Sequence, residues 1–234
     1  MNAVMALAAQ AGLCVAVMLW FWLMRRLSAR LGHPAWANPV LATALAILAA
    51  LAALGLDVQG FQQLAAPLGW ALGPAIVALA AVADLARPLL KGRMRAALLA
   101  ILGGGLFGIG VAGGLAVLLG LYRTLVAAAA VKTVSSPFLI AILGPLDGTV
   151  ALAAALSVTT GVLSAMLVPL MLDRLKIRDR DARAIALGVS GHLVGSEYAI
   201  RSDATRGGLA IIALVVTGLM AAIVLPRLWT ALLG

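Results

Sequence analysis

The chain has 234 residues, of which 64% are hydrophobic and only 11% are charged, and its formal net charge is +9. Soluble domains average about 45–50% apolar and about 25% charged residues, so the composition excludes a soluble globular protein. A transmembrane barrel would show alternating segments of about ten residues, and none is visible. We therefore expect a polytopic helical membrane protein.

The basic residues lie in short clusters between apolar segments. Three clusters stand out: Arg25, Arg26 and Arg30; Arg87, Lys91, Arg93 and Arg95; and Arg174, Lys176, Arg178, Arg180 and Arg183. This placement is typical of cytoplasmic loops, so the positive charge indicates membrane orientation rather than a nucleic-acid partner. Anionic lipid headgroups of the bilayer are the expected partners of these loops.

Apolar runs of membrane-spanning length occur at residues 5–24, 39–56, 64–86, 96–121, 148–172 and 207–225. The first lacks a basic segment before it and ends at Arg25, so we expect a retained span rather than a cleaved signal peptide. Asn38 and Pro39 open the second span, which ends at Asp57. The third carries Gly69, Gly73 and Pro74 and is expected to bend. Cys14 is the single cysteine, which excludes an intrachain disulfide, and no metal or cofactor site is indicated.

The fourth span, residues 96–121, is rich in glycine. Two interpretations are open, since small residues permit close static packing of helices but also give a smooth surface along which a mobile segment could slide. Such faces are also compatible with a homodimer.

The orientation of the loops restricts residues 125–143 and 184–200. Each of these segments must begin and end on the same side if the basic loops are to stay in the cytoplasm. We therefore expect two re-entrant or broken helical segments, entered from opposite faces, with the first turning near Ser135, Ser136 and Pro137. The predicted fold is all-α, a single integral membrane domain over residues 1–234, with about six full spans and two opposed hairpins, as in inverted-repeat transporters.

Polar residues interrupt the apolar sequence in the first of these segments. Lys132 near the membrane interior costs several kilocalories per mole unless it has a partner. Thr133, Ser135 and Ser136 supply hydroxyl donors, and Pro137 suits the start of a half-helix whose N–H groups can bind a carboxylate. The alternative is a lysine that reaches the interface, with hydroxyls that cap helix ends.

A second polar group follows in residues 190–197, within the other predicted hairpin. His192 can take up a proton near physiological pH or can be a packed hydrogen-bonding residue. Glu197 could pair with Lys132 across the two tips or lie at the rim beside Arg201. The remaining candidates for substrate contact are small or hydroxylated: Ser190, Gly191, Gly195 and Ser196.

Enzyme templates match poorly, because the sequence has no paired-carboxylate, nucleotide-loop or metal-ligand motif. We expect no catalytic residues. His33 is expected in the first cytoplasmic loop, and Asp84 is expected to pair with Arg87.

At these motifs the chain resembles the LrgB/CidB family, which includes the plastid glycolate/glycerate transporter of plants. Residues 72–80 (LGPAIVALA) are close to the family's LGPATVALA, residues 132–137 (KTVSSP) resemble its K-[ST]-V-[ST]-[ST]-P block, and residues 187–196 resemble its L-G-x-x-x-H-x-x-G-[TS] block. Thr160 and Gly161 match as well. The resemblance covers about residues 35–230. Ala141 and Tyr198 stand where the family has an acidic and a basic residue.

The resemblance implies a multi-pass protein of the bacterial cytoplasmic (inner) membrane and two functions. The first is secondary transport of small monocarboxylates such as pyruvate or glycolate. For this function we expect Lys132, Thr133, Ser135, Ser136 and Pro137 to bind the carboxylate and His192 and Glu197 to couple to protons. The second is an antiholin-like role in murein hydrolase export and autolysis, with a small holin-like LrgA/CidA partner.

Overall fold

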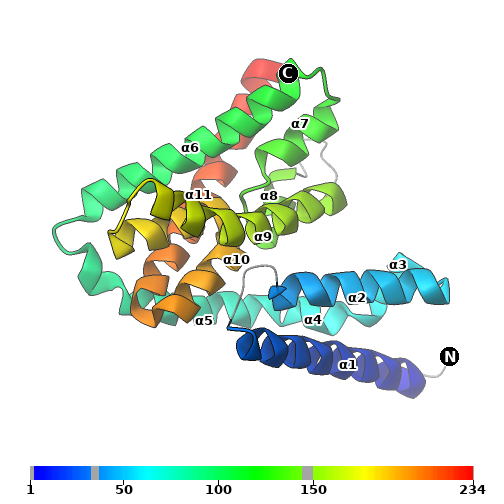
Figure 1. Cartoon of the computed structure of the whole chain (residues 1–234). Coiled ribbons are helices and arrows are strands. Elements are labelled where there is room, and N and C mark those ends of the chain that lie inside the picture. Colours follow the sequence, from blue (N-terminus) through cyan, green and yellow to red (C-terminus); the bar gives the residue numbers. More distant parts are fainter. Residues whose placement is uncertain (1–2, 33–36, 144–149, 234) are drawn as a thin grey trace. The chain divides into compact units, whose positions relative to one another are not determined.

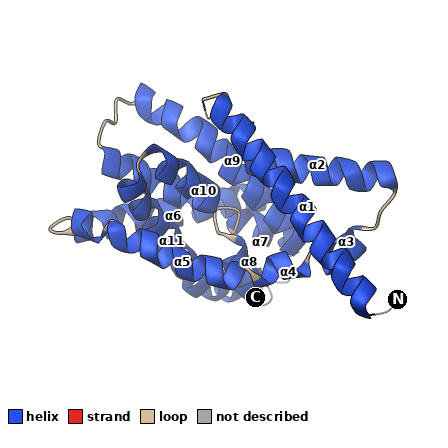
Figure 2. Ribbon diagram, turned by 90° about the horizontal axis from the view of Figure 1, so that it is seen from below, coloured by secondary structure: helices blue, strands red, loops and turns tan. Residues whose placement is uncertain are grey.

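The computed structural model describes residues 3–32, 37–143 and 150–233, and all regular structure within these ranges is helical (Figure 2). The elements are α1 (Ala3–Arg30), α2 (Pro39–Leu54), α3 (Val58–Leu64), α4 (Ala66–Trp70), α5 (Leu72–Leu85), a 3-10 turn (Arg87–Leu90), α6 (Met94–Leu118), α7 (Arg123–Ala130), α8 (Ser136–Leu143), α9 (Val150–Arg174), α10 (Arg180–Ser202) and α11 (Ala204–Leu233). The predicted all-α membrane class is confirmed.

Four of the described helices are long and apolar enough to cross a membrane: Val4–Arg30, Met94–Leu118, Val150–Arg174 and Ala204–Thr230. The other two predicted spans are shorter. α2 has 16 residues, and the predicted third span is divided at Ala71 between α4 and α5, two residues after Gly69. His33, predicted in the first cytoplasmic loop, lies outside the described ranges.

The chain forms two compact units, Met1–Ala78 and Leu79–Gly234, called here the N-terminal and C-terminal units. In the N-terminal unit, α1 packs against α2, α3 and α4. Asn38 caps α2 by accepting hydrogen bonds from the N–H groups of Val40 and Leu41, with Pro39 in the first turn, as the sequence predicts. Gln10 donates a hydrogen bond to the carbonyl of Gln63.

In the C-terminal unit, the glycine-rich helix α6 packs against α7, α10 and α11 (Figure 1). A Cβ atom placed on Gly105 would lie 3.1 Å from Cγ2 of Thr217 on α11, and one on Gly104 would lie 3.4 Å from Val189 on α10. The absent side chains thus let three helices approach closely, in agreement with the packing interpretation of this glycine-rich segment.

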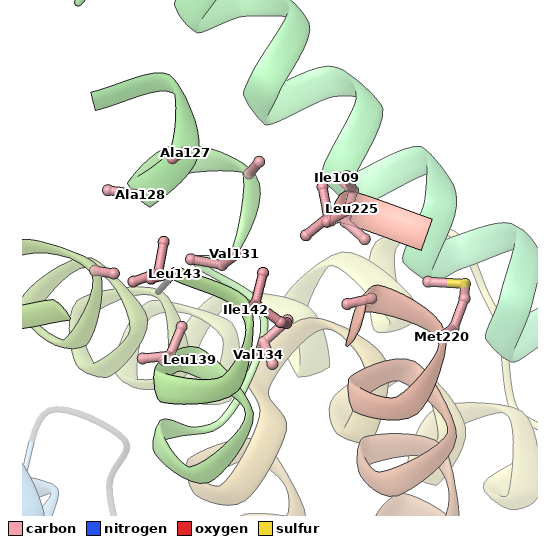
Figure 3. Packing of buried hydrophobic residues seen from close by; sticks show 13 residues of the cluster. Ile109, Ala127, Ala128, Val131, Val134, Leu139, Ile142, Leu143, Met220 and Leu225 are labelled. Atoms are coloured by element: carbon pink, nitrogen blue, oxygen red, sulfur yellow. The ribbon is translucent and has the colours of Figure 1, made fainter. Parts of the chain in front are cut away.

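The first predicted hairpin is formed by α7 and α8. α7 returns along α6, because Ala130 lies opposite Gly113 and Thr133 lies opposite Gly108. The chain turns over residues 131–135, and α8 then packs against α9 and α11. One buried cluster joins both arms, with Ala127, Ala128, Leu139, Ile142 and Leu143 among its members (Figure 3). Residues of α6, α9 and α11 complete this cluster, so the two arms share one core around the turn.

The second predicted hairpin is α10, which is interrupted at His192 (φ 37°, ψ −126°). A Cβ atom on Gly195 would collide with the carbonyl of Leu187, so the two arms, residues 180–191 and 193–202, run back alongside each other. Gly188 in the first arm packs directly against the backbone of Ala210, so the first arm also lies closely on α11. α7 starts near the last turn of α6, whereas α10 is linked by ion pairs to Arg93 at its start, so the two hairpins enter from opposite ends.

Candidate functional site

The turns of both hairpins meet at Ser157, a residue in the first half of α9 that is 1% exposed. Its hydroxyl donates a hydrogen bond of 2.8 Å to the carbonyl of Val134, which belongs to the turn of the first hairpin. The same hydroxyl oxygen lies 3.1 Å from Nε2 of His192, at the break of the second hairpin. One serine therefore joins two polar turns that are far apart in the sequence.

The imidazole of His192 is oriented by the backbone of α9. Nε2 lies 2.8 Å from the carbonyl oxygen of Ser157. A carbonyl can only accept, so Nε2 must carry a hydrogen atom. The ring lies directly over Gly161, where a Cβ atom would be 2.9 Å from Cε1 and from Nε2. Gly161 thus provides the space that the ring occupies, which gives a physical role to one residue of the predicted Thr160-Gly161 match.

Three buried polar atoms around these turns have no hydrogen-bond partner within the described part of the chain. They are Nδ1 of His192, Oγ1 of Thr133 and Oγ1 of Thr217. Thr133 and Thr217 pack on Gly108 and Gly105, which are one turn apart on α6. Buried polar groups are normally paired, so unpaired ones near a broken helix indicate a ligand position.

The rest of the first polar group is arranged around this turn. Lys132 is partly exposed, and no carboxylate of the described residues lies within ion-pair distance of its ammonium group. The carbonyl of Ser135 accepts the N–H groups of Phe138 and Leu139 at the start of α8. Those two N–H groups, predicted to bind a carboxylate, are therefore already engaged. Ser136 and Pro137 form the first residues of α8.

In the second polar group, the serines and glycines pack the hairpin together, and His192 lies at its turn. Ser190 donates to the carbonyl of Ala186 in its own arm, and Ser196 donates 3.2 Å to the carbonyl of Ala210 on α11. Gly191 lies against Ser164, where a Cβ atom would be 3.0 Å from the Ser164 side chain, and Gly195 faces Leu187. These hydroxyls and glycines hold the hairpin together, and His192 is the polar side chain they present to the turn.

Glu197 forms an ion pair of 3.1 Å with Arg201. Of the two predicted placements, the pairing with Arg201 is the one found, and the predicted pairing with Lys132 across the tips is not formed. The reason is helical spacing, because residues four apart share a face of the second arm.

Two cavities border the second hairpin. One, of about 320 Å³, lies between its arms and is lined by Arg180, Arg183, Arg206 and Tyr198. The other, of about 530 Å³, follows α6 and the first arm from Asp181 to Ser190, two residues before the break. The second cavity therefore reaches from the base of the hairpin almost to its turn.

An ion-pair network closes the base of this hairpin. Arg206 pairs with Asp181 at 3.0 Å and with Asp203 at 2.7 Å, and Arg93 pairs with Asp181 at 3.5 Å. The hydrogen bond from Arg206 lowers the pKa of Asp203, and the N–H group of Ala182 lowers that of Asp179. Both carboxylates stay ionised near neutral pH. The predicted Asp84–Arg87 pair is also present, exposed, at 3.6 Å.

Sequence reasoning missed Ser157, Ser164 and Thr217. The hydroxyl of Ser164 donates 3.0 Å to the carbonyl of Ser190, so α9 contacts the second hairpin twice. Isolated hydroxyls in apolar helices were the available signal. Such residues most often bond to their own helix, as Thr159 does to the carbonyl of Ala155, and the sequence alone does not separate the two cases.

A family model described as LrgB-like family matches residues 17–231, nearly the whole chain. An uncharacterized protein of Haemophilus influenzae is similar to the chain, with 28% identity over 218 residues that cover 88% of this chain and 89% of that protein. No solved structure matches the chain significantly.

Proposed function

The chain belongs to the LrgB-like family, and from this premise we propose that it is a secondary carrier of small monocarboxylates in the bacterial cytoplasmic membrane, rather than an enzyme. The observation that supports the proposal best is the meeting of two opposed hairpin turns at Ser157. Irregular backbone at membrane depth is tolerated where it is enclosed or lines a path for a solute. Opposed broken helices that meet near the centre are the usual architecture of carrier sites.

The chemistry of the turns favours an anionic substrate. Lys132 lies next to Thr133 and has no carboxylate within ion-pair distance among the described residues. A substrate carboxylate can supply the missing charge, with the unpaired hydroxyls of Thr133 and Thr217 as additional donors. Helices pack closely at Gly105 and Gly161, so we expect a substrate of only a few heavy atoms.

The base of the second hairpin also favours anions. Three arginines line the cavity between its arms, and Asp203 is the single carboxylate there. Such a surface raises the local concentration of anions before they enter. Because the basic loops are predicted to face the cytoplasm, we place this cavity on the cytoplasmic side.

The test is uptake of radiolabelled pyruvate and glycolate by proteoliposomes, with and without an inward proton gradient. Gradient-stimulated uptake is expected, and Lys132→Ala should reduce it by about tenfold or more, the equivalent of one charge-assisted hydrogen bond. Lys91→Ala, an exposed loop lysine, is the matched control and should transport normally. Full uptake by folded Lys132→Ala protein would refute the carboxylate assignment.

A second candidate is the antiholin-like role with a small LrgA/CidA-like membrane partner. It is favoured by the face of α6 that carries Gly103, Gly110 and Gly114, where a Cβ atom would meet nothing within 4 Å. Spaced by four residues, Gly110 and Gly114 allow a second helix to approach closely. By contrast, Gly108 and Gly113 face the first hairpin and are unsuited to partner binding.

Replacing Gly110 and Gly114 with leucine should abolish co-purification of the partner while leaving carboxylate uptake intact. The same change at Gly108 and Gly113 should instead impair uptake, because it displaces α7. A complex that survives the Gly110/Gly114 change would exclude this face as the partner contact.

A further inference from the structure

We propose that Nδ1 of His192 is the atom that binds the transported proton, and that the site accepts a carboxylate only together with that proton. Each cycle then carries one proton with one monocarboxylate and moves no net charge. This inference rests on the carrier function proposed above and specifies its coupling.

The hydrogen bonds of Ser157 determine which ring nitrogen is available. The hydroxyl of Ser157 gives its hydrogen to the carbonyl of Val134, so only its lone pairs face Nε2 of His192. Its carbonyl oxygen, 2.8 Å from Nε2, also has only lone pairs. Nε2 therefore keeps its hydrogen in every state of the ring, and the nitrogen that can gain or lose a proton is Nδ1.

Nδ1 is buried, and in the described structure it has no donor facing it. Its lone pair can be satisfied by a proton from water, which forms an Nδ1–H bond that then donates to a carboxylate. On release the N–H bond breaks, and the proton leaves together with the carboxylate, so nothing is consumed in the protein.

Because His192 is buried, neither the proton nor the carboxylate binds favourably without the other. An imidazolium without a counter-ion is costly in a side chain that is only 4% exposed. A carboxylate placed against a neutral Nδ1 would bring two sets of lone pairs together, which is also unfavourable. When a proton and a carboxylate bind together, the imidazolium and the carboxylate neutralise each other. The loaded and empty forms of the site therefore carry the same charge.

Within the described residues, Lys132 is the other titratable group on the two turns, and the variant His192→Gln described below separates its contribution from that of His192. The charged side chains on the elements around the ring are Lys132 in the first turn, Glu197 and Arg201 on the second arm, and groups at the distant ends of α9 and α10. Glu197 is held by Arg201. Lys132 is present in both forms and leaves the charge balance unchanged.

The decisive transport experiment uses proteoliposomes and His192→Gln, which retains a side-chain N–H at the Nε2 position but removes the titratable Nδ1. In the wild type, a pH gradient should drive pyruvate accumulation, and a membrane potential imposed with potassium and valinomycin should not. In His192→Gln, the ratio of gradient-driven uptake to pyruvate–pyruvate exchange should fall by about tenfold or more. His33→Gln, the other histidine, serves as the control.

The outcomes separate the two levels of the proposal. Uptake driven by membrane potential, or gradient-driven uptake unchanged in His192→Gln, would overturn the coupling inference while leaving a carrier. A wild-type protein that shows neither uptake nor exchange would refute the carrier function, and the coupling would fall with it.

A spectroscopic measurement keeps the inference testable if His192→Gln does not fold. In ¹⁵N-histidine-labelled His33→Gln protein, His192 is the single histidine and should show a protonated Nε2 and an unprotonated Nδ1 near neutral pH. Saturating pyruvate should remove the unprotonated signal. The reverse tautomer, or an unprotonated Nδ1 signal that pyruvate leaves unchanged, would contradict the assignment.

Discussion

Ser157 is the residue on which the two turns depend. It makes contacts to Val134 through its hydroxyl and to His192 through both its hydroxyl and its carbonyl. Only the hydroxyl contacts can be removed by mutation, and their loss leaves a buried carbonyl at Val134 without a donor. An unsatisfied buried acceptor costs about 1–3 kcal/mol, which is large relative to the stability of one hairpin turn.

We therefore expect Ser157→Ala to lower pyruvate uptake by about tenfold or more, because the two turns lose their shared hydrogen bond. Thr159→Ala is the matched control, since Thr159 is exposed and bonds to its own helix. Uptake measured in proteoliposomes at equal protein content checks this. Equal losses in the two variants would show that hydroxyls of α9 act only through helix stability.

The backbone of His192 leads to a separate prediction. Its φ of 37° lies in the left-handed region, which costs about 1–3 kcal/mol for a residue with a side chain. His192→Gly should therefore be more thermally stable in detergent than His192→Ala, although both lack the imidazole. This order is the reverse of that in an ordinary helix interior. Alanine being the more stable would mean that the turn is not strained.

At the scale of elements, the second hairpin is held at its base by charges and at its turn by neutral hydrogen bonds. Asp181 binds both Arg93 and Arg206, and so links the first arm to the starts of α6 and α11. Its carboxylate is mostly buried, in contrast to the Asp84–Arg87 pair, whose side chains are 73% and 82% exposed. Several charges that form one partly exposed network contribute more to stability than an isolated, fully exposed pair.

Asp181→Asn should accordingly lower the thermal unfolding temperature by about 2–4 °C, whereas Asp84→Asn should change it by less than about 1 °C.

The pH dependence of stability follows from Asp203, whose pKa lies below its usual value of 3.8 because of Arg206. A carboxylate with a lowered pKa stabilises the fold above its unfolded value, and this contribution is lost as the pH falls through the folded value. The contribution of Asp203 to the free energy of unfolding should thus stay constant near neutral pH and should be lost only as the pH falls below about 3.8. Thermal melts at several pH values measure both effects, and a titration between about pH 5 and 8 would point to His192 instead.

For the C-terminal unit as a whole, the two hairpins enter from opposite ends, and the larger cavity extends from the base of the second one to Ser190. The cavity stops two residues before the break at His192, so we expect substrate to approach the turns from this side. Because the basic loops are predicted to face the cytoplasm, the opening should face the cytoplasm as well.

Site-directed labelling tests that arrangement. In a Cys14→Ser background, Ser190→Cys should react with a membrane-impermeant thiol reagent from the cytoplasmic side only. Ser196→Cys, on the same helix but 0% exposed, should remain unlabelled. Labelling of Ser190→Cys solely from the outer side would reverse the predicted orientation.

Local sequence was sufficient to predict the all-α membrane class, the presence of two interrupted segments and the start of α2. Hydropathy predicts membrane helices because it depends on each segment's own composition. Polar residues in apolar runs predicted the first turn near residues 135–137, where the structure has it at 131–135, and marked residues 190–197, which contain the break at His192. Asn38 and Pro39 predicted the start of α2 for the same local reason.

Which polar groups contact one another depends on how the helices pack. Ser157 contacts Val134 and His192 across 23 and 35 residues, respectively, so no local pattern predicts the contacts. Glu197 pairs with Arg201 rather than Lys132, and the N–H groups at the start of α8 are engaged by Ser135. A serine in an apolar helix can bond to its own backbone or to a neighbour, and which occurs depends on what packing places opposite its side chain. The available nitrogen of His192 is likewise a consequence of the carbonyl that packing sets beside the other nitrogen.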